Sequence, residues 1–199
     1  MKEHFLRPPV TPAEWGADLL RVLGLLAVVA AAVWWGWTDA GIAALALPAL
    51  MIPRMLGVRG WFDVLVCVTV LVAAWSNVFD LYTTVSGWDL LLHFVCTGVL
   101  AILAALGVAH AGVVEMTPGP GVPRRRALVL VPTVALAISA VWEMVEWAGW
   151  TYVSDEIYVT YQDTIGDMVF GGLGGVAAGA LLAAVSVLRP VNASTSAGA

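Results

Sequence analysis

Three short motifs of this sequence each place two ionisable side chains on one face of an expected helix. Side chains three or four residues apart are neighbours on a helix surface. Each motif borders a long apolar segment, and ionisable groups are costly inside a membrane helix unless they pair or do work. The six residues are Asp89 and His93 in "WDLLLHF", Glu143 and Glu146 in "WEMVEW", and Asp163 and Asp167 in "YQDTIGDM".

The chemistry that suits five acids and one histidine at one level is cation binding. Crowded carboxylates cannot all stay charged without a counter-ion: either their like charges leave some of them protonated, or a bound divalent cation removes the repulsion. One imidazole with several carboxylates, and no thiolate, favours Zn²⁺, Mn²⁺ or Fe²⁺. We therefore expect a divalent metal ion with His93, Glu143, Glu146 and Asp167 as ligands, and with Asp89 or Asp163 as a general base or ligand-orienting group.

Other interpretations of these residues stay open at the level of the sequence. Asp89 and Asp163 stand at expected helix N-termini, where an acid caps free backbone N–H groups. Glu143 and Glu146 could lie just outside the hydrocarbon and be solvated. Without a metal, the cluster would be a proton relay or a hydrogen-bonded structural lock. The inner halves of these three spans are almost wholly apolar, which argues against a continuous polar path.

The elements that must position the motifs are membrane-spanning helices. The chain of 199 residues is 61% hydrophobic and 12% charged, which is too apolar for a soluble domain of this size. Its basic residues form no stripe that would indicate nucleic-acid binding. We predict an all-α, polytopic membrane helical bundle of about six transmembrane helices. The expected spans cover residues 17–37, 40–58, 61–79, 89–110, 127–148 and 164–188, the second being the weakest because it contains Pro48 and Pro53.

The distribution of charge predicts the orientation of these spans. All nine Lys and Arg residues fall on one side of a six-span arrangement, and such residues are retained in the cytoplasm. The opposite loops carry acids and most of the tryptophans, which favours an aromatic belt and leaves open an aromatic-walled pocket. We therefore expect a cytoplasmic N-terminal segment (residues 1–16), a six-helix membrane domain (residues 17–188) and a disordered cytoplasmic tail (residues 189–199).

Glycines at a four-residue spacing form a smooth ridge on the last expected span. They are Gly171, Gly175 and Gly179. Small residues at this spacing let helices approach closely, so we expect the ridge to pack inside the bundle rather than to form a dimer. The sequence leaves the oligomeric state open.

The same motifs carry a resemblance to a known family. "WDLLLHF", "WEMVEW" and "YQDTIGDMVFGGLGG" resemble the YjdF-like bacterial inner-membrane proteins, distant relatives of the VanZ-like group, over roughly residues 60–185. VanZ-like members usually carry an Asn after the final Asp of the last helix, where this chain has "MVFGG". The resemblance implies a multi-pass helical fold in the bacterial plasma (inner) membrane, and the link of VanZ-like proteins to glycopeptide resistance points to the cell envelope.

These observations lead to two hypotheses of function. The first is a membrane enzyme with a metal-dependent polar site in the outer leaflet, acting on a lipid or a lipid-linked envelope precursor. The alternative is a non-enzymatic envelope protein or a proton-coupled carrier, in which the cluster is a structural lock or a proton relay. Neither hypothesis involves nucleic acid, and both place the protein in a lipid bilayer.

Overall fold

The computed structural model describes residues 1–115, 125–155 and 157–190 of the chain. Within these residues the fold is helical, with one isolated β-bridge and no longer strand. Six helices are long and apolar enough to cross a membrane, which confirms the predicted polytopic bundle. Arg124, Glu156 and residues 191–199 of the expected tail lie outside the described residues. The helices are α1 (Lys2–Leu6), α2 (Pro12–Trp34), α3 (Trp37–Leu56), α4 (Gly60–Val78), α5 (Leu81–Thr84), α6 (Trp88–His110), α7 (Arg125–Tyr152) and α8 (Tyr161–Ala184).

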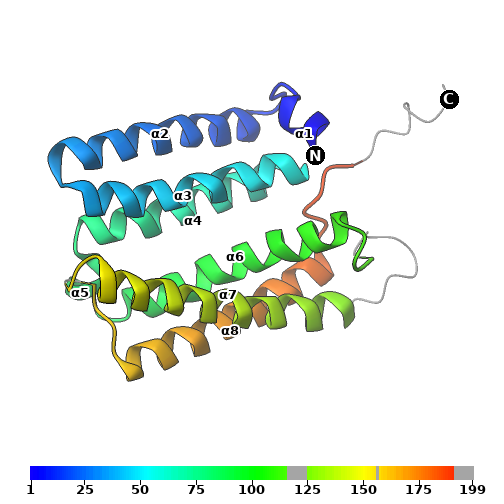
Figure 1. The fold of residues 1–199 in the computed structure, drawn as a ribbon. Coiled ribbons are helices and arrows are strands. Elements are labelled where there is room, and N and C mark those ends of the chain that lie inside the picture. The colour runs from blue at the N-terminus through cyan, green and yellow to red at the C-terminus, as the bar shows by residue number, and fades with distance from the viewer. Residues whose placement is uncertain (116–124, 156, 191–199) are drawn as a thin grey trace, which may run out of the picture.

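The long helices form two three-helix units (Figure 1). The first unit contains α2, α3 and α4, and the second contains α6, α7 and α8. Because each unit has an odd number of spans, the second unit enters the bundle from the side opposite to the first. Figure 1 places α1 at one end of the molecule and α5 at the other, and we call these the α1 end and the α5 end.

The first long helix begins at Pro12 rather than near residue 17 because a capping box starts it there. The Thr11 side chain accepts a hydrogen bond from the Glu14 backbone N–H at 3.3 Å. The Glu14 carboxylate accepts in return from the Thr11 N–H at 3.3 Å. This reciprocal arrangement, with Pro12 at the first helical position, is a strong helix start.

The second expected span is one continuous helix despite its prolines. Helix α3 covers 20 residues and contains both Pro48 and Pro53. At 1.5 Å per residue, 20 residues extend about 30 Å, which is the thickness of a hydrocarbon core. The span that composition made doubtful is therefore long enough to cross.

The last span ends at Ala184, short of the expected residue 188. After Ala184 the chain becomes extended and pairs with the connection between α3 and α4. Val58 and Leu188 form an antiparallel bridge. The Arg59 N–H donates to the Val187 carbonyl at 2.7 Å, and the Arg189 N–H donates to the Gly57 carbonyl at 3.2 Å. Both ends of the described chain consequently lie at the α1 end (Figure 1).

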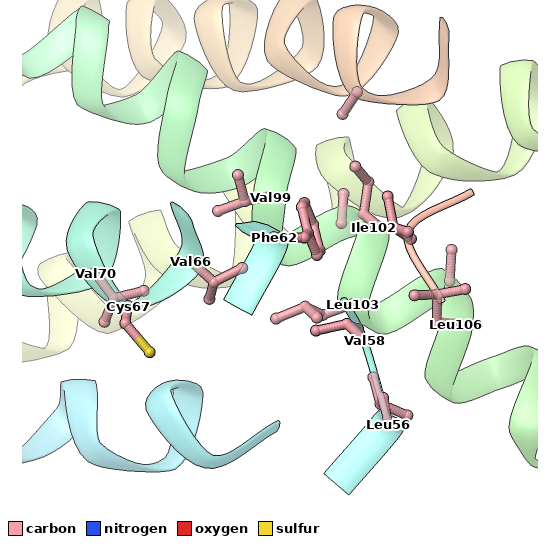
Figure 2. Close-up of a cluster of buried hydrophobic side chains, with 14 of the residues drawn as sticks. Leu56, Val58, Phe62, Val66, Cys67, Val70, Val99, Ile102, Leu103 and Leu106 are labelled. Carbon is pink, nitrogen blue, oxygen red and sulfur yellow. The ribbon is translucent and has the colours of Figure 1, made fainter. Parts of the chain in front are cut away.

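A buried apolar core joins the two units. Phe62 of α4 is fully buried, and Ile102 and Leu103 of α6 are nearly so. Figure 2 shows these side chains gathered between the helices, together with Val58 and Leu106. Lipid tails are as apolar as these residues, so their contribution in a bilayer is close packing rather than removal from water.

Helix α8 lies between α6 and α7 with glycines against both. A Cβ atom on Gly171 would lie 2.5 Å from Ser139 Oγ, and one on Gly179 would lie 2.9 Å from the Ala127 carbonyl oxygen of α7. The predicted glycine ridge therefore packs inside the bundle, as expected. On the other side, a Cβ on Gly174 would overlap the Phe94 carbonyl of α6.

Candidate metal centre

The three motifs converge at the α5 end of the second unit. Helices α6 and α8 both begin at this end, and α7 ends there, so the motifs on all three helices meet at one level (Figure 1). Three of the side chains are deeply buried, since His93 is 8% exposed, Glu143 7% and Asp167 1%. The convergence that helix direction and spacing predicted is therefore present in the fold.

His93 lies between a carboxylate of its own helix and one of α8. Its Nε2 atom is 3.4 Å from Asp89 Oδ1, one turn earlier on α6. The same atom is 3.8 Å from Asp167 Oδ2 on α8. One ligand-capable atom from each of these three residues lies within 4.8 Å of the others, so the three form a first candidate triad.

The same histidine belongs to a second triad, with the two glutamates of α7. One ligand-capable atom from each of His93, Glu143 and Glu146 lies within 4.8 Å of the others. Two ligands held about 2.2 Å from a single ion are at most about 4.4 Å apart, so small side-chain rotations would close either triad around a metal. His93 is the residue that both arrangements share.

Two buried carboxylate oxygens in this cluster have no hydrogen-bond partner among the described residues. They are Glu143 Oε1 and Asp167 Oδ1. A buried polar atom is normally paired, and leaving a charged one unpaired is costly. A cation bound between these oxygens and His93 would supply the missing interaction.

The capping interpretation of the two aspartates does not match the positions that they occupy. Gly87 is the N-cap of α6, which has no side-chain cap, and Thr160 is the N-cap of α8. The Thr160 hydroxyl accepts from the Asp163 backbone N–H at 3.3 Å. Both aspartates lie in the first turn, where an acid interacts favourably with the helix dipole. Asp89 belongs to the first triad, whereas Asp163 belongs to neither, and the roles predicted for them stay predictions.

The interpretation of the glutamates as solvated groups does not hold for Glu143. This side chain is buried within the protein, and the Thr164 hydroxyl of α8 lies within hydrogen-bonding reach of its carboxylate. Glu146, one turn later, is half-buried. The exposed tryptophans near this end, Trp142, Trp147 and Trp150, fit the aromatic belt.

Tyr82 of α5 is a neighbour of the cluster that the motifs did not reveal. Burial first, and then the negative charge of Asp89 and other acids, raises the pKa of this phenol. Its hydroxyl donates to the Ala73 carbonyl of α4 at 2.9 Å. Tyr82 is therefore a neutral residue that ties the short helix to the first unit beside the site.

A second polar cluster, at the α1 end of the first unit, was missed by the sequence analysis. Arg21 of α2 lies 2.5 Å from Asp63 of α4, and these side chains are 6% and 2% exposed. Arg21 also lies 3.0 Å from Asp18 and donates to the Leu50 carbonyl at 2.9 Å. Asp18 in turn pairs with Arg54 of α3. Arg21 and Arg54, expected only as signals of orientation, are therefore partners of buried acids.

Comparison with known proteins agrees with this architecture. Residues 17–187 match the model of the family described as "Predicted membrane protein (DUF2238)". The match covers most of the chain, including all three motifs, and the chain belongs to this family. No curated protein and no solved structure matches it.

Proposed function

Starting from this membership of a membrane protein family, we propose that the protein is a metal-dependent membrane enzyme acting on the phosphate-bearing headgroup of a lipid or lipid-linked envelope precursor. One observation carries the proposal. Glu143 Oε1 and Asp167 Oδ1 are buried without partners beside the only cationisable side chain of the cluster, His93. A site of this composition attracts a divalent cation.

The polar cluster at the α1 end supports a metal over a structural lock. There the acids Asp18 and Asp63 are matched by the guanidinium groups of Arg21 and Arg54. Buried charges that only hold helices together are normally paired in this way. The cluster at the α5 end holds five acids and one histidine, with no Lys or Arg beside them in the three motifs. These acids can be neutralised by protonation or by a positive charge from outside the chain, and a divalent cation would supply that charge.

The donor set favours Zn²⁺, Mn²⁺ or Fe²⁺. His93 supplies one nitrogen, and Glu143, Glu146 and Asp167 supply carboxylate oxygens, which is a mixture that these ions accept. When bound, such an ion would polarise a phosphoryl oxygen or activate water. Asp89, 3.4 Å from His93, is in place to orient the imidazole or to accept a proton.

The proposal also includes the orientation of the protein in its membrane. The eight basic residues that the structure describes lie toward the α1 end, and this bias supports an orientation with both termini in the cytoplasm. The metal centre would then lie in the outer leaflet, where lipid-linked envelope precursors are used. The motifs at the cluster support membership of the YjdF-like branch and a location in the bacterial plasma membrane.

Metal analysis of the purified protein tests the proposal. The wild-type chain should bind Zn²⁺, Mn²⁺ or Fe²⁺ at close to one ion per chain, and His93→Ala, Glu143→Gln and Asp167→Asn should each lose it. Asp39→Asn is the matched control, because Asp39 is an acid near the α5 end that is bonded to Asn77 and stands outside the cluster. Metal-loaded protein would then be screened for hydrolysis or transfer of phospholipid headgroups.

The same measurement can overturn the proposal. If the wild-type chain binds none of the three ions at micromolar free concentration, the metal centre does not exist. If in addition the cluster variants are only less stable, the cluster is the structural lock of the alternative hypothesis. The search for function would then move to protein partners in the envelope.

A further inference from the structure

An apolar groove runs along the contact between α6 and α8. It has a volume of about 170 Å³ and is partly open. It exists because Gly98 and Gly174 bring the two backbones together, so no side chain fills the space beside their contact. A Cβ on Gly98 would lie 2.9 Å from the Gly174 carbonyl oxygen. The lining includes Phe94, Gly98 and Ile102 of α6 and Gly174, Ala177 and Leu181 of α8.

The groove lies next to the candidate metal centre along the α6 sequence and two turns beyond it along α8. Its first residue on α6, Phe94, follows His93 directly, and its lining extends to Ile102. Eight residues of helix rise about 12 Å. On α8 the lining begins at Gly174, two turns after Asp167. The groove therefore covers the part of α6 and α8 that lies between the level of the polar cluster and the interior of the bilayer, whose midplane is about 15 Å from either edge of the hydrocarbon.

This layout is that of a membrane lipid beside a helix. A phospholipid has its phosphate at the membrane surface and its acyl chains directed to the midplane. Ala177 of the lining is exposed, so in a bundle of spanning helices lipid has access to the groove at this residue. A space of about 170 Å³ accommodates a stretch of hydrocarbon chain but not a helix, whose diameter is about 10 Å.

We propose that this groove holds an acyl chain of a phospholipid whose phosphate lies at the candidate metal centre. The inference rests on the proposed function and deepens it, because it names a glycerophospholipid as the substrate class. A lipid chain gains little from leaving the bilayer for an apolar surface, so close packing and the headgroup interaction select the ligand. The chain in the groove fixes where the phosphate sits relative to His93.

Photo-crosslinking in nanodiscs tests the inference. The probe is phosphatidylglycerol with a diazirine in one acyl chain, and labelled peptides are identified by mass spectrometry. Label should concentrate on residues 94–102 and 174–181. Ala177→Phe, which fills the groove from an exposed position, should reduce this label by about threefold or more. Val176→Phe is the matched control, because Val176 is 54% exposed and does not line the groove.

Two further comparisons separate this inference from the proposed function. Diacylglycerol carrying the same diazirine chain lacks the phosphate, so adding metal should increase groove label from phosphatidylglycerol only. Metal content is measured on Ala177→Phe, where it should equal that of the wild type. If the label also spreads evenly over the exposed leucines of α2, or if Ala177→Phe does not reduce it, the groove does not bind the acyl chain, even if the protein binds metal. Failure of the wild-type chain to bind metal overturns the proposed function instead.

Discussion

His93 of α6 holds its Nε2 atom 3.8 Å from the Asp167 carboxylate of α8, across a contact between two helices that begin at the same end. The approach of the two residues depends on Gly98 of α6 and Gly174 of α8, which allow the two helices to pack closely. Gly174 allows α8 to touch the Phe94 carbonyl, the residue next to His93. The geometry of the candidate metal centre therefore depends on backbone packing as well as on its side chains.

Adding one methyl group at Gly174 should disturb the site from a distance. In Gly174→Ala, the new Cβ would overlap the Phe94 carbonyl, and relief of such overpacking costs about 1–3 kcal/mol and separates the helices. We expect lower thermal stability and weaker metal binding. Gly107→Ala is the control, because a Cβ atom added at Gly107 would meet no neighbouring atom within 4 Å. Ala also favours a helix over Gly by about 1 kcal/mol. Equal behaviour of both variants in thermal unfolding and metal titration would contradict this dependence.

Neutralising Asp167 should not destabilise the metal-free protein. Its Oδ1 atom has no partner among the described residues and its Oδ2 atom lies 3.8 Å from His93, so Asp167→Asn removes a buried charge that is only partly compensated. In chelator we expect an unfolding temperature equal to or above that of the wild type. Metal at about 100 times its Kd should stabilise the wild type by about 2.7 kcal/mol and leave the variant unchanged. A marked loss of stability in chelator would instead identify a structural lock.

Metal affinity should weaken as the pH falls. The ion competes with protons for the His93 imidazole and for the carboxylates, because each ligand must be deprotonated to bind. For every proton released on binding, the apparent Kd rises up to about tenfold per pH unit below the range where the ligands titrate. Isothermal titration at about pH 7.5 and about pH 5.5 in two buffers of different ionisation enthalpy measures both the affinity and the protons released. An affinity independent of pH would exclude these residues as ligands.

Breaking the ion pair at the α1 end should be much more damaging than breaking an exposed one. Arg21→Met leaves Asp63 buried beside an apolar side chain, and loss of one partner of a buried pair costs about 3–5 kcal/mol. The control is Arg126→Met, whose pair with Glu115 is exposed and worth at most about 1 kcal/mol.

The double variant Arg21→Met/Asp63→Leu tests the mechanism of that loss. It removes both charges, so it should recover much of the stability measured for Arg21→Met in thermal unfolding. Metal binding should stay at the wild-type level throughout, since the pair belongs to the other unit. A double variant as unstable as the single one would show that Arg21 acts through its bond to the Leu50 carbonyl instead.

The candidate site was readable from the sequence because its geometry is local and periodic. A spacing of four puts Asp89 beside His93 on one helix, and the alternation of spans brings the start of α8, with Asp167, to the same end. Hydropathy predicted the six long helices because each must be long and apolar enough to cross the same thickness of bilayer. Periodicity and membrane thickness were sufficient for this part of the fold.

Long-range pairs were beyond the reach of the sequence. The local sequence pattern does not predict that Arg21 forms an ion pair with Asp63. Each of the two residues could also be interpreted as a charge near the start of a helix. The antiparallel bridge between Val58 and Leu188, which follows the early end of α8, is also a contact between segments far apart in the sequence. Local patterns do not predict such a contact. The start of α2 is different, because the capping box in "TPAE" is a local signal that the sequence itself contains.

The orientation of the bundle should place the metal centre outside the cytoplasm. Val85 follows α5 at one end, and Val113 follows α6 at the other, and both are exposed at 43% and 73%. In cells treated with a membrane-impermeant thiol reagent, we expect Val85→Cys to be labelled and Val113→Cys to be labelled only after lysis. The wild-type chain gives the background, because Cys67 is buried and Cys96 is partly buried. The reverse pattern would put the basic residues outside, against the positive-inside rule, and would move the candidate centre to the cytoplasmic leaflet.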